Sequence, residues 1–175
     1  LQRSGAKNQN GRIYPKDILA REVANYKATQ IAEKRALGEL DHPESSVVNL
    51  NNVSHNILDC WWNGDDVIGK VEILGTPSGN ILKELLKAGI LLGISSRGLG
   101  SVKELDEGTV AVEDDFELIC WDFVSNPSTH GAFMKPIQSE GLLAEGILNQ
   151  NQSYAKVNTI IRDILCEMKG CCPVD

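Results

Sequence analysis

Two short segments of this chain carry residue types that could do covalent chemistry. The first, residues 38–43, reads Gly-Glu-Leu-Asp-His-Pro and sets a histidine beside a carboxylate. The second, residues 93–101, reads Gly-Ile-Ser-Ser-Arg-Gly-Leu-Gly-Ser and holds two adjacent serines next to an arginine. A serine hydroxyl is a weak nucleophile until a base takes its proton, and histidine is the usual base near neutral pH. Together the two segments predict nucleophilic acyl transfer.

These segments belong to a longer series of motifs that resembles a known family. The series runs through residues 10–16, 37–43, 61–67, 95–101 and 122–128, in that order. It resembles the prohead proteases of large tailed phages of the T-even type, which are serine peptidases related in fold to the herpesvirus assembly protease. No single tripeptide carries this resemblance, because it rests on the joint wording and order of all five segments.

The resemblance implies a catalytic triad. His42 would be the base, Ser95 the nucleophile, and Asp122 the carboxylate that orients the imidazole ring. Ser96 is the rival nucleophile, because adjacent serines on an extended segment point to opposite sides and only one can face His42. Three further residues stay open as the third member: Asp115, Glu117 and His130.

Substrate-binding groups are also implied by the resemblance. The oxyanion hole is expected at Arg97 and Gly98, where a glycine-rich turn allows N–H groups to approach closely. The family favours a Glu just before the scissile bond and a Leu or Ile two residues ahead of it. Such a Glu requires a cation in its pocket. The candidates close by in the sequence are Arg97, Lys103, Arg35 and Lys70.

The activity that follows is a serine endopeptidase. It would cleave phage scaffold and capsid proteins at Leu/Ile-x-Glu sites during prohead maturation, inside the assembling prohead in the host cytoplasm, and a homo-oligomer is compatible with it. It would also cut itself between Glu145 and Gly146, within Leu143-Ala144-Glu145-Gly146. The alternative is a catalytically inactive capsid-assembly scaffold protein that keeps the protease-like barrel.

Composition argues against several other classes of function. The net charge of −7 and the scattered basic residues argue against a nucleic-acid surface. No apolar run approaches the length of a membrane span. A phosphate-binding loop starting at Gly93 fails because Leu99 stands where the lysine is needed. No pair of cysteines or histidines has metal-site spacing, so we expect no metal. We also expect no cofactor and, from the charge and the lengths of the apolar runs, no nucleic-acid partner and no membrane.

Hydrophobic periodicity predicts the elements that position these residues. We expect helices over residues 15–36 and 80–88 and strands over 47–50, 57–62, 67–74, 90–95, 110–112 and 116–124. Asn63-Gly64 predicts a hairpin turn, and Gly38 predicts the end of the first helix. The fold class is α+β, with an antiparallel β-barrel core and flanking helices. The resemblance implies that this barrel is herpesvirus-protease-like.

Domain organisation follows from a change in composition near residue 135. Residues 1–134 form the expected protease domain, and the polar segment 135–152 is the expected linker. Residues 153–175 place their large apolar side chains on one helical face and predict a C-terminal amphipathic helix.

Overall fold

The computed structural model describes residues 1–137, within which residues 1–135 form one compact unit. Its strands are β1 (Gln2–Arg3), β2 (Arg12–Ile13), β3 (Leu37–Glu39), β4 (Val53–Asn63), β5 (Asp66–Ile73), β6 (Gly93–Leu99), β7 (Val102–Asp106), β8 (Thr109–Val112) and β9 (Glu117–Val124). Its helices are α1 (Lys16–Tyr26), continued by the π-helical turn Lys27–Ile31, and α2 (Pro77–Lys87). A short 3-10 turn, Leu50–Asn52, precedes β4.

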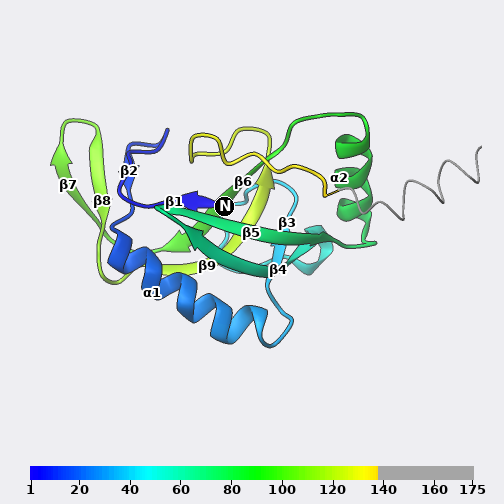
Figure 1. Ribbon diagram of the computed structural model, residues 1–175, viewed down its shortest axis with the longest axis horizontal. Helices are drawn as coiled ribbons and strands as arrows, with labels where there is room; N and C mark the ends of the chain where they lie inside the picture. Colours follow the sequence, from blue (N-terminus) through cyan, green and yellow to red (C-terminus); the bar gives the residue numbers. More distant parts are fainter. Residues whose placement is uncertain (138–175) are drawn as a thin grey trace, which may run out of the picture. The chain divides into compact units, whose positions relative to one another are not determined.

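The strands form three ladders that curl into a half-barrel (Figure 1). Their orders are β1-β5-β4-β3, β2-β8-β7 and β6-β9. A bridge between Leu40 and Phe123 links the end of β3 to β9, so the first ladder continues into the third. The expected mixture of many strands with few helices is confirmed. The sheet is a half-barrel and not wholly antiparallel, because β2 pairs with β8 in parallel.

The core lies between the curled sheet and α1. Trp121 and Phe123 on β9 are buried together with Ile57 of β4 and Ile94 of β6. Tyr26, at the end of α1, packs edge-on against Trp121 with ring centroids 4.8 Å apart. In Figure 1 α1 runs along β9 and β4, while α2 lies against the far end of β4 and β5. This packing fixes β6 and β9, the two strands that carry the fourth motif, residues 95–101, and the fifth, residues 122–128.

Helix boundaries differ from the sequence expectation at the end of the first helix and at the start of the second. The first helix leaves helical conformation after Ile31, and Lys34 adopts a φ of 57°. Gly38 does not cap a helix, because it lies inside β3 and pairs with His55 of β4. The second helix starts earlier than predicted, since Thr76 accepts a hydrogen bond from Gly79 N–H and caps it.

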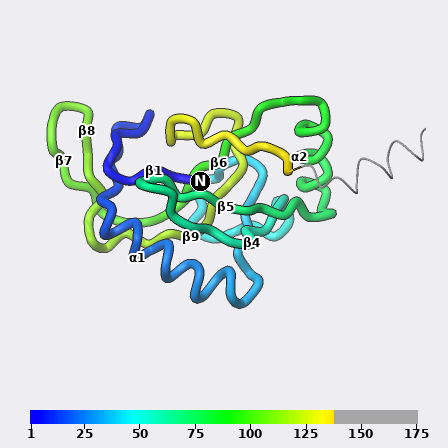
Figure 2. Tube along the Cα trace, in the orientation of Figure 1, coloured from blue at the N-terminus to red at the C-terminus, as the bar shows by residue number. Residues whose placement is uncertain are grey.

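The expected strand over residues 47–50 is wrong. Residues 41–49 form a loop in which Ser45 and Val47 bond to each other locally, and the Asn49 side chain accepts from Asn51 N–H. Such side-chain bonds compete with strand pairing. The loop follows β3 and lies beside β6 and β9, which come much later in the chain (Figure 2).

Candidate active site

His42 sits where the chain turns away from β3. Asp41 adopts a φ of 72°, and its backbone N–H donates to the carbonyl of Phe123 at 2.8 Å. Its side chain accepts from the His42 N–H at 2.9 Å. These bonds fix the turn and direct the histidine ring along β9. The side chain of His42 remains 38% exposed, so one edge of the ring is open to solvent.

A buried carboxylate holds the other edge of this ring. His42 Nδ1 lies 3.0 Å from Oδ2 of Asp122, a fully buried residue on β9. A carboxylate only accepts, so Nδ1 carries the proton and Nε2 has its lone pair free. Burial by itself raises the pKa of Asp122. Hydrogen bonds from His42 and from the Glu39 backbone, with the charge of Arg97, outweigh burial and lower that pKa below its ordinary value.

Ser95 shares a face of the sheet with this pair. It pairs directly with Asp122 in the antiparallel ladder between β6 and β9, and paired residues point to the same side. Its Oγ lies 3.2 Å from the Oγ of Ser128, in the loop after β9. Within residues 1–137 no hydrogen bond joins the His42 ring to Ser95. Hydrogen bonds of this kind are often long in free enzymes and tighten when substrate binds.

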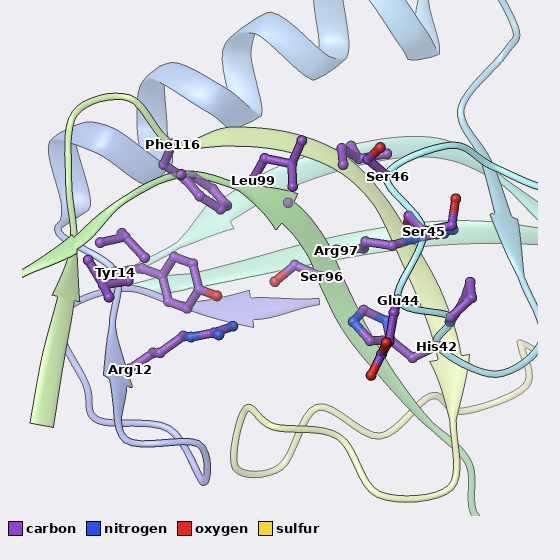
Figure 3. Close-up of a pocket in the computed structure, with 16 residues that line it drawn as sticks. Arg12, Tyr14, His42, Glu44, Ser45, Ser46, Ser96, Arg97, Leu99 and Phe116 are labelled. Carbon is purple, nitrogen blue, oxygen red and sulfur yellow. The ribbon is translucent and has the colours of Figure 1, made fainter. Parts of the chain in front are cut away.

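Ser96 points the other way. It pairs with Trp121, whose ring lies in the core, so its side chain is on the opposite face of β6 from Ser95. Figure 3 shows the Ser96 hydroxyl directed toward Tyr14 and Arg12, with His42 on the other side of the strand. The alternation along β6 therefore favours Ser95 over Ser96 as the partner of His42.

The remaining candidates for the third position lie elsewhere. Asp115 accepts from the backbone and hydroxyl of Ser101, at the start of the β7–β8 hairpin. Glu117 is exposed on β9, and His130 is exposed in the loop that follows β9. His55 is buried and its Nε2 is bonded to the Trp121 carbonyl at 2.9 Å. Asp122 is thus the acidic side chain that contacts the His42 ring.

Arg97 is not a surface residue. Its guanidinium is buried and donates to Glu39, to Asp122 and to the carbonyl of Ser45, while its Nε–H points at the sulfur of Cys120. A side chain held by so many partners is not free to stabilise an oxyanion directly. Any such role for Arg97 and Gly98 is left to their backbone N–H groups, beside the register shift between the two residues.

A cleft opens in front of His42. Two adjoining cavities of about 270 and 160 Å³ share His42, Ser96, Arg12 and Tyr14 as lining residues. The larger cavity ends in an apolar wall, made by Leu99, Val102, Val112, Phe116 and Ile119. The smaller one is lined by both serines and by polar side chains, with no carboxylate: Gln9, Asn10, Asn126 and Ser128.

Arg12 is the cation that sequence reasoning missed. It lies on β2, is exposed, and has no ion-pair partner among residues 1–137. Figure 3 shows its guanidinium pointing into the cleft. Lys103, Arg35 and Lys70 do not line either cavity. The one sequence signal that could have indicated Arg12 is that it lies within the first motif, residues 10–16.

Other chemistries find little support in the described residues. Burial raises the pKa of Cys60 to about 11 and that of Cys120 to about 12, so neither is a ready thiolate nucleophile. Residues 1–137 contain no cluster of three side chains suited to hold a metal ion. None of the helices in that range is long and apolar enough to cross a membrane.

A carboxylate–histidine pair whose histidine lines the same cavity as a strand serine is the arrangement typical of a serine-type hydrolase. Comparison with known proteins identifies the family. The family model described as prohead core protein serine protease matches residues 1–151. The prohead core protein protease of Enterobacteria phage T4 is 36% identical over 151 residues, covering 84% of this chain and 71% of the relative.

A solved structure agrees with this assignment. The bacteriophage T4 capsid assembly protease, gp21, superimposes with a TM-score of 0.69 at 36% identity, covering 71% of this chain and 78% of that one. The chain therefore belongs to the prohead core protein serine protease family, and it is a serine-type protease of phage prohead maturation. The resemblance seen in the five motifs is confirmed.

Proposed function

We propose that this protease cleaves capsid and scaffold proteins inside the assembling prohead, with Ser95 as nucleophile, His42 as base and Asp122 as the orienting carboxylate. The names of the T4 relatives, a prohead core protein protease and a capsid assembly protease, support the substrates and the place of action. The observation that carries the residue roles is the register of β6 and β9, which sets Ser95 opposite the carboxylate bound to His42.

The reaction begins when Ser95 turns from Ser128 toward His42. Nε2 of His42 accepts the hydroxyl proton while Oγ attacks the peptide carbonyl. The tetrahedral oxyanion takes hydrogen bonds from backbone N–H groups, for which Arg97 and Gly98 are our candidates. The imidazolium, stabilised by Asp122, then protonates the leaving amine. Water then attacks the acyl-enzyme carbonyl while His42 takes its proton, and His42 returns that proton to Oγ of Ser95 as the ester bond breaks and the acid product leaves.

Specificity for Leu/Ile-x-Glu fits the two ends of the cleft. The smaller, polar cavity beside Ser95 offers Arg12 to a substrate carboxylate. An extended peptide carries its third residue about 7 Å from the first, and the apolar wall around Phe116 suits a Leu or Ile there. Arg97, a candidate from the sequence, is already neutralised by Glu39 and Asp122.

Three finer expectations remain part of this proposal. The half-barrel is related to the herpesvirus protease fold, the enzyme acts in the host cytoplasm within the prohead, and it uses no nucleic-acid partner. The net charge of −7 supports the last of these. A homo-oligomer remains compatible with the site.

The test compares two neighbouring serines. Ser95→Ala should lower kcat/KM on a Leu-x-Glu peptide by roughly 10⁴-fold, because the nucleophile is lost. Ser96→Ala, the matched control one residue along the strand, should stay within about tenfold of the parent. Loss of activity in Ser96→Ala alone would identify Ser96 as the nucleophile. Full activity in both variants would contradict a mechanism with either serine as nucleophile. A parent protein that labels with no serine-reactive probe and cuts no peptide would favour the inactive scaffold alternative.

A further inference from the structure

Glu39 is a buried carboxylate for which the catalytic scheme has no use. It lies at the end of β3, three residues before His42, and is 1% exposed. Burying a carboxylate is costly unless hydrogen bonds and an opposite charge compensate it. Oε1 accepts from Asn49 N–H at 2.9 Å, and Oε2 accepts from the Asn52 amide at 3.2 Å. The opposite charge comes from Arg97.

Arg97 bridges Glu39 and Asp122. Its Nη2 donates to Glu39 Oε1 at 2.7 Å and to Asp122 Oδ1 at 3.1 Å, and its Nε lies 3.0 Å from Asp122 Oδ2. Burial by itself lowers the pKa of Arg97, but the hydrogen bond that Arg97 donates to Glu39 and the negative charge of Asp122 raise it overall. Arg97 is therefore a permanent cation directly behind the carboxylate that holds His42.

The contact between Arg97 and Asp122 would weaken the effect of Asp122 on His42 if Glu39 were absent. A guanidinium in contact with Asp122 would cancel the negative charge that has to stabilise the His42 imidazolium. With Glu39 included, the two carboxylates and one guanidinium sum to a single negative charge. The cluster becomes neutral when His42 takes the proton of Ser95.

We propose that Glu39 is a positioning residue that offsets Arg97, so that Asp122 keeps its full electrostatic effect on His42. The inference rests on the proposed roles of His42 and Asp122. The simpler role for Glu39 is to anchor the loop through Asn49 and Asn52. The two roles differ in one observable, because only the electrostatic one moves the titration of the His42 ring.

Other titratable groups lie around His42 and Asp122 and stay unchanged in the comparison. Asp41 and Glu44 lie on its own loop, Arg12 and Tyr14 lie across the cleft on the β2 side, and the Cys120 thiol lies beside Asp122.

The experiment follows the His42 ring by NMR in the full chain with the Ser95→Ala change, which keeps cleavage from interfering. The protein has three histidines, so a His42→Gln spectrum assigns the signal. Glu39→Gln preserves shape and removes one negative charge. The pH at which the His42 signals titrate should fall by on the order of one unit, because the imidazolium loses stabilisation. Arg97→Gln should move it upward, since it removes the opposing charge.

A matched control is available in Glu22, a second buried carboxylate, which binds Arg21 and Leu118 N–H away from His42. Glu22→Gln should cost stability without moving the His42 titration. In the active chain, Glu39→Gln should lower kcat about tenfold with little change in KM and shift the acid limb of the pH–rate profile the same way.

The outcomes distinguish a failure of the role proposed for Glu39 from a failure of the proposed function. A His42 titration that is unmoved in folded Glu39→Gln overturns the inference. If Glu39→Gln does not fold, Arg97→Gln decides, and a downward shift or no shift there overturns it. A shift as expected in a protein that cleaves no Leu-x-Glu peptide supports the electrostatic role and contradicts the proposed function instead.

Discussion

Arg12 and Arg97 both line the cavity that contains His42, but their surroundings suit them to different roles. Arg97 is buried and bound by two carboxylates, whereas Arg12 is exposed and has no ion-pair partner within residues 1–137. A substrate carboxylate that enters the cleft meets Arg12 at little desolvation cost to existing pairs. We therefore propose that Arg12, and not Arg97 of the Ser-Ser-Arg-Gly motif, is the cation that recognises a substrate Glu.

Replacing Arg12 should therefore change specificity more than chemistry. Arg12→Gln should lower kcat/KM on a Leu-x-Glu peptide by about 10- to 100-fold, the loss of one charge-assisted contact, and leave the Leu-x-Gln peptide nearly unaffected. Steady-state kinetics on the peptide pair measures the ratio. Arg3→Gln, on an exposed arginine that forms a bidentate pair with Asp66, is the control and should leave the ratio unchanged. Equal losses on both peptides would contradict the assignment.

Sequence reasoning proposed His42, Ser95 and Asp122 because a motif resemblance is compared residue by residue, and the structure places His42 against Asp122 and pairs Ser95 with Asp122. It did not reach Glu39, Arg12 or Ser128, although all three lie within matched segments. Their importance depends on which charges and hydroxyls the fold brings together across many residues of chain. Arg97, for instance, meets Glu39 from 58 positions away, and no local pattern records that pairing.

At the scale of elements, Gly38 has a different purpose from the one predicted. A Cβ at this position would collide with the Trp121 carbonyl and the His55 ring. The glycine thus lets β3 approach β4 and β9 closely enough for Leu40 to bridge Phe123, and this bridge delivers His42 to Asp122. A glycine after a helical pattern suggests a cap, and only the fold distinguishes a cap from a close approach.

Gly38→Ala should accordingly destabilise the whole sheet. We expect a loss of about 3 kcal/mol or more, or failure to fold, because the colliding atoms are backbone and a fully buried ring. Thermal or denaturant unfolding measures it. Gly75→Ala is the matched control, since nothing lies within 4 Å of its Cβ position, and it should stay within about 1 kcal/mol of the parent. A folded Gly38→Ala protein of parental stability would contradict the close-approach argument.

The elements that local signals specify strongly were predicted well. The Asn63-Gly64 hairpin is confirmed, with Asn63 paired to Asp66 and Gly64 at a φ of 63°. Strand β7 was missed because every residue from Val102 to Asp106 is exposed and shows no inward-facing alternation. The 41–49 loop was partly mistaken for a strand because Val47 and Val48 favour strands, yet Val47 is 71% exposed and makes local polar contacts.

At the scale of the whole molecule, the site is assembled from strands that are far apart in the chain. The β2 strand supplies Arg12, the turn after β3 supplies His42, β6 supplies Ser95, and β9 supplies Asp122. None of these groups lies near the others until the half-barrel has folded. We therefore expect a chain that lacks β9, which ends at Val124, to be inactive.

Self-cleavage is the prediction that concerns the full chain. The expected cut between Glu145 and Gly146, with the linker and C-terminal helix expected around it, lies outside the described residues apart from residues 135–137. Active protein should release a fragment ending at Glu145, and Ser95→Ala and Glu145→Gln should each abolish it. Intact mass over time measures both. The preference for an acid before the scissile bond predicts the Glu145→Gln effect, and the nucleophile predicts the other.

Two other segments also fit the Leu-x-Glu pattern, and one of them is a second exposed candidate for cleavage. Leu165-Cys166-Glu167-Met168 falls within the expected C-terminal helix, where an extended substrate would require unwinding. Leu105-Asp106-Glu107-Gly108 is exposed at the end of β7, in the hairpin turn before β8. Exposure alone does not make a substrate, because a protease binds an extended strand and this turn is closed by the Asp106–Thr109 pairing and a Gly108 φ of 70°.

Glu107→Gln should therefore leave the fragment pattern unchanged. A fragment ending at Glu107 would mean that the hairpin opens readily and that chain conformation does not protect this site, while absence of any fragment from an enzyme that cuts a Leu-x-Glu peptide would show that Glu145 is not used.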